Sequence, residues 1–451
     1  MQKNEQLNLT ITALSHEGNG IARHNGMAIF IPNTAPGDEV EAKILKTHPN
    51  YAYARLESII KPSPDRVQND CPAYPRCGGC TLRHLSYRAE LAAKENWVHE
   101  NLARIGKLTP RWDSITSSPI QGRYRNKAQY PVRLVNDKIR AGFFAPRSHT
   151  LIPVEDCRLQ PAFFADLTRE ITAFCEEHSI PAYDEGSHSG LLRQICIRCA
   201  ESSSQTLVCL VLNGRDFPLA DTLVKRLKPL CPGPLSFHIN INRERTNAIF
   251  GKKTRHLFGP PAIEDTLCGL KIRLSPQSFY QVNRQAAELL YGTVLEYAAP
   301  NGRETLLDLY CGAGAIGLSM ASKVKSVIGV EIFPEAVLDA EENARVNGID
   351  NARFLTAAAA QAAGQLRKWG VRPDIALIDP PRKGLDAETI EQIIAILPPR
   401  IVYISCNSAT LARDAAQLAQ KGYKATKGRV VDLFPRTAHV ECVLELVLSD
   451  R

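Results

Sequence analysis

The sequence contains no long hydrophobic run, although 44% of its 451 residues are hydrophobic. A helix that crosses a membrane needs about 18 or more consecutive apolar residues, and no stretch approaches that length. The first ten residues, MQKNEQLNLT, also contain no apolar core of signal-peptide length. We therefore expect a soluble, cytoplasmic protein that does not associate with a membrane.

A strong excess of charge of either sign is also missing, since the formal net charge is only +8. Such a surplus permits an anionic partner but does not require one. Disulfides are not expected either, because the cytosol keeps thiols reduced. The 13 cysteines are therefore expected to be core residues, metal ligands or reactive groups.

The order of sequence patterns predicts three domains. Short strand-like segments separated by turn signals such as GNG and APGD fill residues 7–60, and five such strands suggest a small barrel that binds oligonucleotides. The segment KPSPDR follows as a linker, then a mixed α+β section. Alternating apolar strands and amphipathic helices near the end predict a doubly wound α/β sheet. The predicted domains are residues 1–65, 66–270 and 271–451.

The segment CPAYPRCGGC brings three cysteines together on a loop: Cys71, Cys77 and Cys80. Thiolates at this spacing can converge on one metal ion or cluster, which needs a fourth ligand from elsewhere. Cys157 is the best candidate because it also follows a proline-containing loop. The spacing is compatible with zinc and with an iron–sulfur cluster. Cys196 and Cys199 lie on a predicted strand, where residues i and i+3 face opposite ways, so we expect them to be packing or surface residues.

A glycine-rich loop in LDLYCGAGAIGLSM follows an apolar strand and precedes a helix, which is typical of a nucleotide-cofactor site. The pattern G-x-G-x-x-G permits a nicotinamide cofactor. Asp308, just before the loop, is instead predicted to lie near a positive ligand such as the sulfonium of S-adenosylmethionine. Glu331 ends the next strand, where a carboxylate binds ribose hydroxyls. Asp379 begins DPPR, a loop stiffened by two prolines that resembles nucleobase-directed methyltransferases.

The segment ISCNSATLARD places Cys406 between a strand at 401–405 and a helix that Asn407 or Ser408 can cap. A helix N-terminus is expected to lower the pKa of this thiol and favour a nucleophilic thiolate. A thiolate that adds to C6 of uracil makes C5 nucleophilic toward a methyl sulfonium, and a base must then remove the C5 proton. Glu441, at the start of an apolar strand, is the best candidate for that base.

Together these motifs resemble the RNA (uracil-5-)methyltransferases, in particular the iron–sulfur branch that acts on 23S ribosomal RNA. The resemblance extends from a TRAM-like beginning through SPQSFYQVN to FPRTAHVE, near the end of the chain. It implies a TRAM barrel, an iron–sulfur central domain and a class I, Rossmann-like methyltransferase domain. It also implies a [4Fe-4S] cluster on the four loop cysteines, Cys406 as nucleophile and Glu441 as base. The residues that it implies for S-adenosylmethionine are Gln281, Tyr310, Glu331 and Asp379.

Two positions depart from relatives in this resemblance: Ala315 in the glycine loop, and Ala358, where an acidic or amide residue often meets the adenine. The expected partner is RNA with a flipped-out uridine in a single-stranded or loop region, bound by a monomer. Arg123, Arg125 and Lys127 are candidates to hold phosphates. The alternatives are a noncatalytic iron–sulfur RNA-binding or redox-sensing module, a nicotinamide oxidoreductase, and methylation of DNA or a small molecule.

Overall fold

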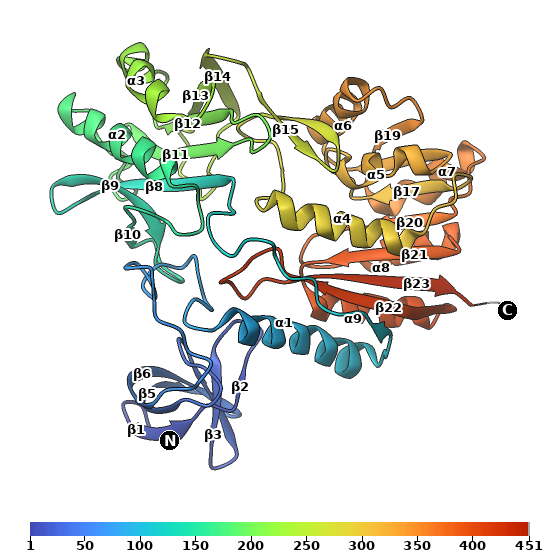
Figure 1. Cartoon of the computed structure of the whole chain (residues 1–451), viewed down its shortest axis with the longest axis horizontal. Helices are drawn as coiled ribbons and strands as arrows, with labels where there is room; N and C mark the ends of the chain where they lie inside the picture. Colours follow the sequence, from blue (N-terminus) through green and yellow to red (C-terminus); the bar gives the residue numbers. More distant parts are fainter. Residues whose placement is uncertain (450–451) are drawn as a thin grey trace.

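The computed structural model describes residues 1–449, which form three sheets of six or more strands and one two-stranded hairpin (Figure 1). The first sheet curls around a small core of Leu, Ile, Val and Ala side chains, in the order β1-β5-β6-β4-β3-β2. The sequence predicted five short strands in this region, whereas the structure has six, including the two-residue β2. The strands are β1 (Gln6–Thr10), β2 (Ala13–Leu14), β3 (Gly20–His24), β4 (Met27–Ile31), β5 (Glu39–Thr47) and β6 (Tyr51–Lys61).

The linker after β6 is held by a buried carboxylate from the barrel. Asp38 accepts a hydrogen bond from the Ser63 amide at 2.8 Å and pairs with the Arg66 guanidinium at 2.8 Å. The Arg66 side chain reaches back further, to the Asn33 carbonyl at 2.7 Å. These charge-assisted contacts fix the direction in which the chain leaves the barrel.

The second sheet has the order β10-β9-β8-β11-β12-β13-β14, and α2 (Phe163–Glu177) and α3 (Ala220–Leu227) pack on one face of it. The predicted CxxC strand is β11, with Cys196 and Cys199 in two different core clusters. This confirms that the two thiols face opposite sides of the sheet. The strands are β8 (Lys127–Val135), β9 (Lys138–Phe144), β10 (Leu151–Pro153), β11 (Leu192–Cys199), β12 (Thr206–Leu212), β13 (Leu235–Ile241) and β14 (Lys253–Phe258).

The third sheet has the order β19-β18-β17-β20-β21-β23-β22-β7. Its first five strands are parallel, whereas β23 runs antiparallel to both β21 and β22. This confirms the predicted doubly wound α/β fold. The strands are β7 (Arg111–Trp112), β17 (Thr305–Leu309), β18 (Ser326–Glu331), β19 (Ala352–Thr356), β20 (Ile375–Ile378), β21 (Arg400–Ser405), β22 (Tyr423–Val431) and β23 (Glu441–Leu448).

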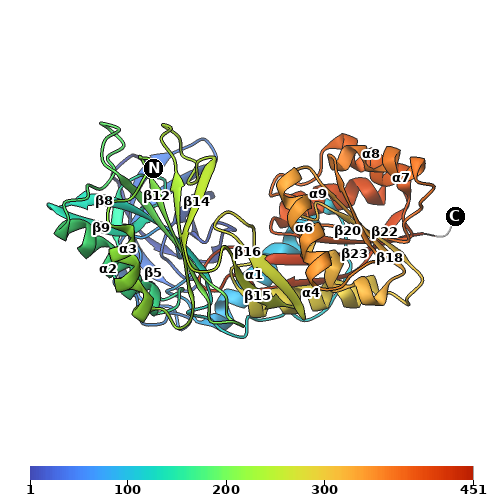
Figure 2. The same cartoon turned by 90° about the horizontal axis from the view of Figure 1, so that it is seen from above.

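Helices cover both faces of this third sheet. On one face α4 (Arg284–Ala298), α5 (Ala315–Ser319) and α6 (Pro334–Val346) share a core with the hairpin β15 (Ile263–Leu267) and β16 (Leu270–Leu274). On the other face lie α7 (Ala362–Lys368), α8 (Ala387–Ile396) and α9 (Ser408–Ala419). Seen from above, the central and C-terminal sheets lie on opposite sides, with β16 and α1 between them (Figure 2).

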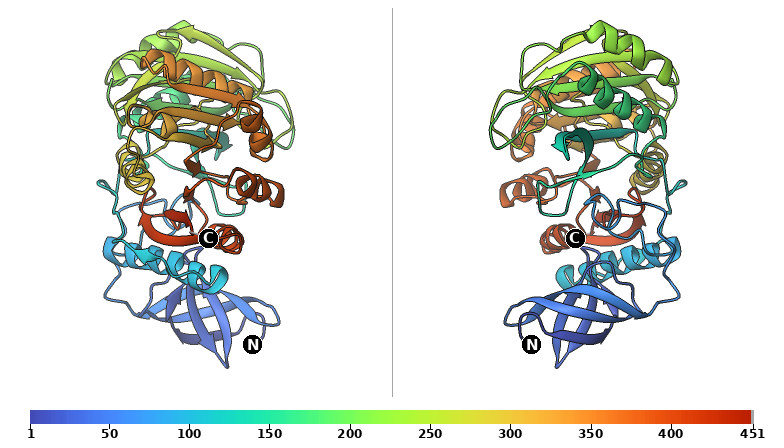
Figure 3. Two further views of the ribbon diagram at one scale, coloured as in Figure 1. Left: turned by 90° about the vertical axis from the view of Figure 1, so that its right-hand side faces the viewer. Right: turned by 90° about the vertical axis from the view of Figure 1, so that its left-hand side faces the viewer.

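Helix α1 (Tyr87–Asn101) connects the barrel to the C-terminal sheet (Figure 3). The Trp97 indole donates a hydrogen bond to the Leu14 carbonyl of the barrel at 2.9 Å. Val98 of the same helix packs in the core under α8 and α9, and β7 pairs with β22 soon after. A segment from the early part of the chain therefore completes a sheet that is otherwise built from its last third.

Candidate active site

The predicted site residues converge on one edge of the C-terminal sheet. Tyr310 follows β17, Glu331 ends β18, Asp379 follows β20 and Cys406 follows β21. Since these strands are parallel neighbours, their carboxyl ends meet at the same edge. Strand β23 points away from the central domain in Figure 1, so its antiparallel neighbour β21 points toward it. The site thus opens toward the centre of the molecule.

The glycine loop is tied to the end of β18 by Glu331. One carboxylate oxygen accepts the Gly312 amide at 3.1 Å, and the other accepts the amides of Ile332 and Phe333 at 2.8 and 3.0 Å. Gly312 and Gly314 have φ values of 54° and 79°, a region that glycine adopts without strain. Glu331 therefore shapes the loop in addition to presenting a carboxylate at the strand end.

Asp308 has a structural role within the protein, and its predicted place near a positive ligand stays a prediction. Its side chain is only 2% exposed, and its Oδ2 accepts the Gly317 amide at 3.0 Å, near the start of α5. A Cβ on Gly317 would lie 2.8 Å from that oxygen, so glycine is needed for this approach. Burial raises the pKa of Asp308 to about 7. The Asp308 carboxyl group thus stabilises the glycine loop from its buried side.

Tyr310 and Gln281 come from two distant segments of the chain. Tyr310 has φ of 63°, a conformation that costs free energy for a non-glycine residue and that clusters at functional sites. Gln281 precedes α4, and its carbonyl accepts the Asn126 side-chain amide at 2.9 Å. Asn283 caps α4 by accepting the Ala286 amide, and its own amide donates to the Leu433 carbonyl. Gln281 was selected by resemblance alone, because no pattern in its segment distinguishes it.

The two departures from relatives are alanines at helix starts. Ala315, in the glycine loop, is the first residue of α5, and Ala358 precedes the short helical turn Ala359–Gln361 that leads into α7. Alanine carries no side-chain hydrogen-bonding group, so neither residue can contact a cofactor through a polar side chain.

Cys406 and Glu441 are brought together by the register of two antiparallel strands. Ser405 pairs with Cys442, so the next position along places Cys406 beside Glu441. Residues directly opposite each other in such a pair have Cβ atoms about 5 Å apart. Asn407 accepts the Ala409 amide to cap α9, and its side-chain amide donates to the Arg382 carbonyl at 3.1 Å. This one residue therefore locks the DPPR loop to the cysteine.

The charges around Cys406 correct one prediction. Desolvation, followed by the negative charges of Glu441 and Asp379, raises the pKa of the Cys406 thiol, while Arg382 opposes the increase. The expected lowering of the pKa by the helix N-terminus is outweighed first by desolvation of the sulfur and then by the two carboxyl groups beside it. Desolvation also raises the pKa of Glu441 well above its ordinary value and that of Asp379 to about 7.

Arg382 is a site residue that the sequence analysis did not select. It lies within hydrogen-bonding distance of the His439 ring, at 3.2 Å from Nδ1, and it is the positive group nearest the Cys406–Glu441 pair. The signal was present in the motif DPPR, where an arginine follows the two prolines at a strand end. Desolvation and this arginine lower the pKa of His439 to about 4, so the ring is neutral at physiological pH.

A buried ionic network supports the segment before Glu441. Lys94 of α1 is 0% exposed and donates to Glu90 and to Asp432, each at 2.7 Å, and to the Phe434 carbonyl at 3.2 Å. Glu90 in turn accepts the Arg436 amide at 2.7 Å. Buried charges are costly unless paired in this way, and removal of one partner is strongly destabilising. The network fixes residues 432–436 and, through them, the start of β23.

The four loop cysteines line one small cavity of about 60 Å³, the cysteine cavity: Cys71, Cys77, Cys80 and Cys157. Burial raises the pKa of Cys80 to about 12, and Cys157 adds to the increase. Arg125 also lines the cavity, and its Nε has no hydrogen-bond partner among residues 1–449. Across that described range, no three Cys, His, Asp or Glu side chains are arranged to hold a single metal ion.

The basic stretch proposed for phosphates is largely engaged within the protein. Arg123 pairs with Asp156 and donates to the carbonyls of Cys157 and Gln160, both at 2.9 Å. Desolvation lowers the pKa of Lys127 to about 8. Arg125, as described, faces the cysteine cavity. The structure therefore contradicts the prediction that these side chains are free to hold RNA phosphates.

Comparison with known proteins agrees with this site. Residues 263–449 match the family model tRNA (Uracil-5-)-methyltransferase, and residues 2–56 match the TRAM domain. An uncharacterized RNA methyltransferase of Halalkalibacterium halodurans is 40% identical over 100% of this chain and 98% of its own length. One from Listeria monocytogenes is 42% identical over 100% and 99%.

A solved structure shows the same fold. It is the Pyrococcus abyssi tRNA (uracil-54, C5)-methyltransferase in complex with S-adenosyl-L-homocysteine, with a TM-score of 0.78 and 24% identity, covering 98% of this chain and 100% of the other. No helix within residues 1–449 is long and apolar enough to span a membrane. The methyltransferase relatives rule out the nicotinamide enzyme and the noncatalytic module. The chain belongs to the RNA (uracil-5-)methyltransferase family and is an S-adenosylmethionine-dependent enzyme.

Proposed function

We propose that this enzyme methylates C5 of a uridine in 23S ribosomal RNA through a covalent adduct between Cys406 and C6 of the base. The observation that carries the proposal is the register of β21 and β23, which sets Cys406 beside Glu441 at the edge where the cofactor loop also lies. A uridine in a duplex cannot present C6 to this edge, so the base must leave its stack.

The proposed chemistry begins with the Cys406 sulfur. The Cys406 thiol first loses its proton to one of the two carboxylates beside it, Asp379 or Glu441. The thiolate then donates an electron pair to C6, and the electrons of the C5–C6 double bond move to C5 and the adjoining carbonyl. S-adenosylmethionine, when bound, would supply an electrophilic methyl group that C5 attacks, with S-adenosylhomocysteine as the leaving group. Glu441 then removes the C5 proton, the double bond re-forms, and the C6–S bond breaks to release the thiolate. Burial raises the pKa of Glu441 well above its ordinary value, which makes its carboxylate a stronger base for this step.

The cofactor contacts are proposed for Gln281, Tyr310, Glu331 and Asp379, which surround the glycine loop. Glu331 suits the ribose hydroxyls because carboxylate oxygens accept several hydrogen bonds. Asp379 suits the positive end of the cofactor, since an ionised carboxylate there offsets its charge. Arg382, which contacts His439 and lowers the pKa of Glu441, stabilises negative charge at this edge.

We further propose that Cys71, Cys77, Cys80 and Cys157 hold a [4Fe-4S] cluster, with zinc as the alternative. Four thiolates are the usual ligand set of such a cluster. Arg125, with a buried Nε that lacks a partner within residues 1–449, and Arg83 suit the negative charge of bound thiolates. The proposed domains are 1–65, 66–270 and 271–451, with α1 and β7 reaching from the second to the third. The proposed state is a monomer.

The test is incubation with labelled S-adenosylmethionine and unmodified ribosomal RNA, followed by nucleoside analysis. Labelled 5-methyluridine is expected in the large-subunit RNA. Transfer RNA is the second candidate substrate, because it appears in the name of the family model and of the Pyrococcus abyssi enzyme. Label in transfer RNA alone would replace the ribosomal assignment, and its absence from both RNAs would refute the proposal.

A further inference from the structure

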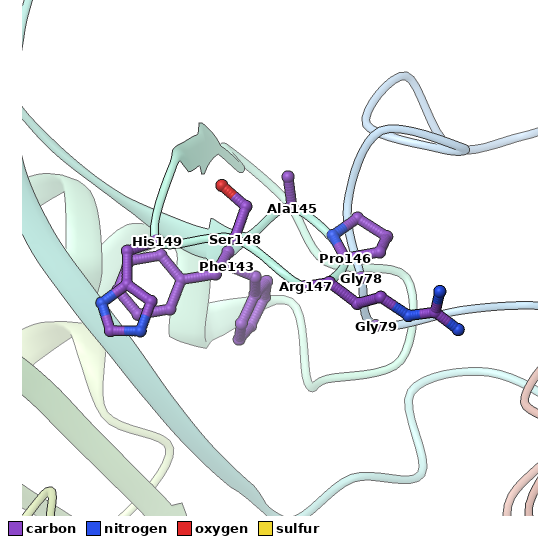
Figure 4. Close-up of a pocket in the computed structure, with 9 residues that line it drawn as sticks. Gly78, Gly79, Phe143, Ala145, Pro146, Arg147, Ser148 and His149 are labelled. Carbon is purple, nitrogen blue, oxygen red and sulfur yellow. The ribbon is translucent and has the colours of Figure 1, made fainter. Parts of the chain in front are cut away.

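Two adjoining pockets form a groove on the central domain, away from the residues of the methyl-transfer site. The first, of about 560 Å³, lies between Gly78 and Gly79 and the turn at residues 143–149 (Figure 4). The second, of about 380 Å³, shares Phe143, Phe144 and His149 with the first and continues to Tyr183. We call the two together the Phe144 groove. Each has the volume of a typical small-ligand site.

An exposed aromatic stack lines the point where the two pockets meet. The His149 ring lies flat against Phe144, with centroids 5.1 Å apart and an angle of 10° between the planes. The His149 side chain is 58% exposed, and the Arg133 guanidinium lies 5.6 Å from the centre of the Phe144 ring. A flat ring that is open to solvent on one side and backed by a second ring suits an unpaired nucleobase.

The charge of the groove suits a polyanion. Arg133, Arg147 and Arg193 line it, against one acidic residue, Glu185. Arg193 is bound to backbone carbonyls and has a structural role. Arg147 is 78% exposed, and within residues 1–449 it forms a single ion pair, a 3.5 Å contact to Glu17 of the barrel. Figure 4 shows Arg147 and His149 extending to opposite ends of the turn, so a base and a phosphate can be contacted together.

Backbone contacts connect the groove to the methyl-transfer site. The Gly78 amide donates to the Phe144 carbonyl at 3.1 Å, and a Cβ on Gly78 would lie 2.9 Å from that oxygen. A few residues later, the amides of Thr81 and Leu82 donate to the Arg436 carbonyl at 3.0 and 3.1 Å. One short segment therefore touches both the groove and the loop that leads to Glu441.

We infer that the Phe144 groove binds a single-stranded segment of the RNA substrate that flanks the target uridine. One unpaired base stacks on His149, and a phosphate meets Arg147, whereas Arg133 pairs with Glu185 and holds the wall of the groove. The inference rests on the proposed function, because it assigns the RNA of that reaction to this surface. Aromatic stacking and dispersed positive charge give affinity with little sequence preference. This surface thus supplies binding rather than choice of the modified base.

The test compares His149→Ala and Arg147→Gln with Arg169→Gln, an exposed arginine on α2 outside the groove, in the full-length protein. Fluorescence anisotropy measures binding of a labelled oligouridine and of an RNA duplex of equal length. For oligouridine, His149→Ala is expected to weaken binding about tenfold. Arg147→Gln is expected to reduce the salt dependence by about one charge. Arg169→Gln should match wild type, and duplex binding should change little.

Crosslinking provides a second, independent readout. RNA that contains 4-thiouridine is irradiated on the wild-type protein, and the attached peptide is identified by mass spectrometry. Attachment within residues 143–149 is expected. Crosslinks confined to other segments, together with unchanged oligouridine affinity in both groove variants, would overturn the inference.

Methyl transfer separates this inference from the proposed function. In active enzyme, the groove variants should raise KM for RNA with little change in kcat or in the Kd of S-adenosylmethionine. Wild-type protein that makes no 5-methyluridine but binds oligouridine through His149 would refute the proposed function and leave the groove as an RNA site. Normal methyl transfer with wild-type KM in both variants would refute the groove as an RNA site and leave the proposed function intact.

Discussion

We propose a chemical role for half-buried cysteines at two sites, the cysteine cavity and Cys406. The two sites differ in the groups that surround the sulfur atoms. In the cysteine cavity the thiols face one another, with arginines in the wall. At Cys406 a single thiol faces two carboxyl groups and one arginine. A shared cavity of thiols suits a bound cation or cluster that carries positive charge. A thiol beside carboxyl groups suits the exchange of protons during a reaction, so the same residue type serves two functions.

The sharpest contrast should come from removing each kind of thiol. Cys406→Ala is expected to reduce methyl transfer by about 10⁴-fold or more, because the covalent step is lost. Filter binding and isothermal titration should show unchanged affinity for RNA and for S-adenosylmethionine. Cys231→Ala, a half-buried cysteine outside both sites, is the matched control. Retained activity in Cys406→Ala would contradict the nucleophile assignment.

Glu441→Gln should separate proton removal from thiolate attack. The rate is expected to fall about 10²–10⁴-fold, and the RNA adduct should accumulate because the C5 proton remains. Denaturing gels with end-labelled RNA measure the adduct directly. Glu296→Gln, on the exposed side of α4, serves as control. A slow variant with no more adduct than wild type would assign the base to another residue.

Cys80→Ser should affect the cysteine cavity and not the methyl-transfer site. Wild type purified without oxygen is expected to contain about four irons and four sulfides per chain, and the variant few of either. Thermal unfolding should occur at a lower temperature, because a bound cluster stabilises the folded state. The affinity for S-adenosylmethionine should remain, since no cluster ligand lies near the glycine loop in the chain. One zinc and no iron in wild type would replace the cluster by a zinc site.

The smallest expected effect is a pH dependence at the cofactor site. Asp379 and Asp308 have pKa values raised to about 7, so both are largely neutral below that pH. Ionised Asp379 attracts the positive sulfonium, so affinity for S-adenosylmethionine should rise about tenfold between about pH 6 and about pH 8. S-adenosylhomocysteine, which lacks the sulfonium charge, should show a weaker dependence. Equal profiles for the two ligands would show that the carboxyl groups do not sense that charge.

Local signals predicted much of the fold around the site. The strand before Cys406, the Asn407 cap and the buried face of α9 all follow from spacing within a dozen residues. The predicted pKa direction at Cys406 was wrong because the burial of the sulfur, and the approach of Glu441 and Asp379 from distant segments, depend on tertiary structure. The roles of Asp308 and Arg382 were also set by partners on other segments.

Helix α1 and strand β7 were harder to place because their partners come late in the chain. The Lys94–Asp432 pair joins residues separated by more than 300 positions, and no periodicity in either segment identifies the other. Nothing in the sequence of α1 identifies the sheet that it covers. The sequence alone therefore does not predict which distant segments contact each other.

The Lys94 network has a consequence for how the protein is made. The ribosome synthesises α1 several hundred residues before Asp432. During most of synthesis, Lys94 therefore cannot form its ion pair with Asp432. Glu90, one turn away at 2.7 Å, gives that lysine a temporary counterion. The ion pair that joins α1 to the C-terminal sheet can form only when translation is nearly finished. Interrupted synthesis would thus leave chains with a finished barrel and no finished catalytic domain.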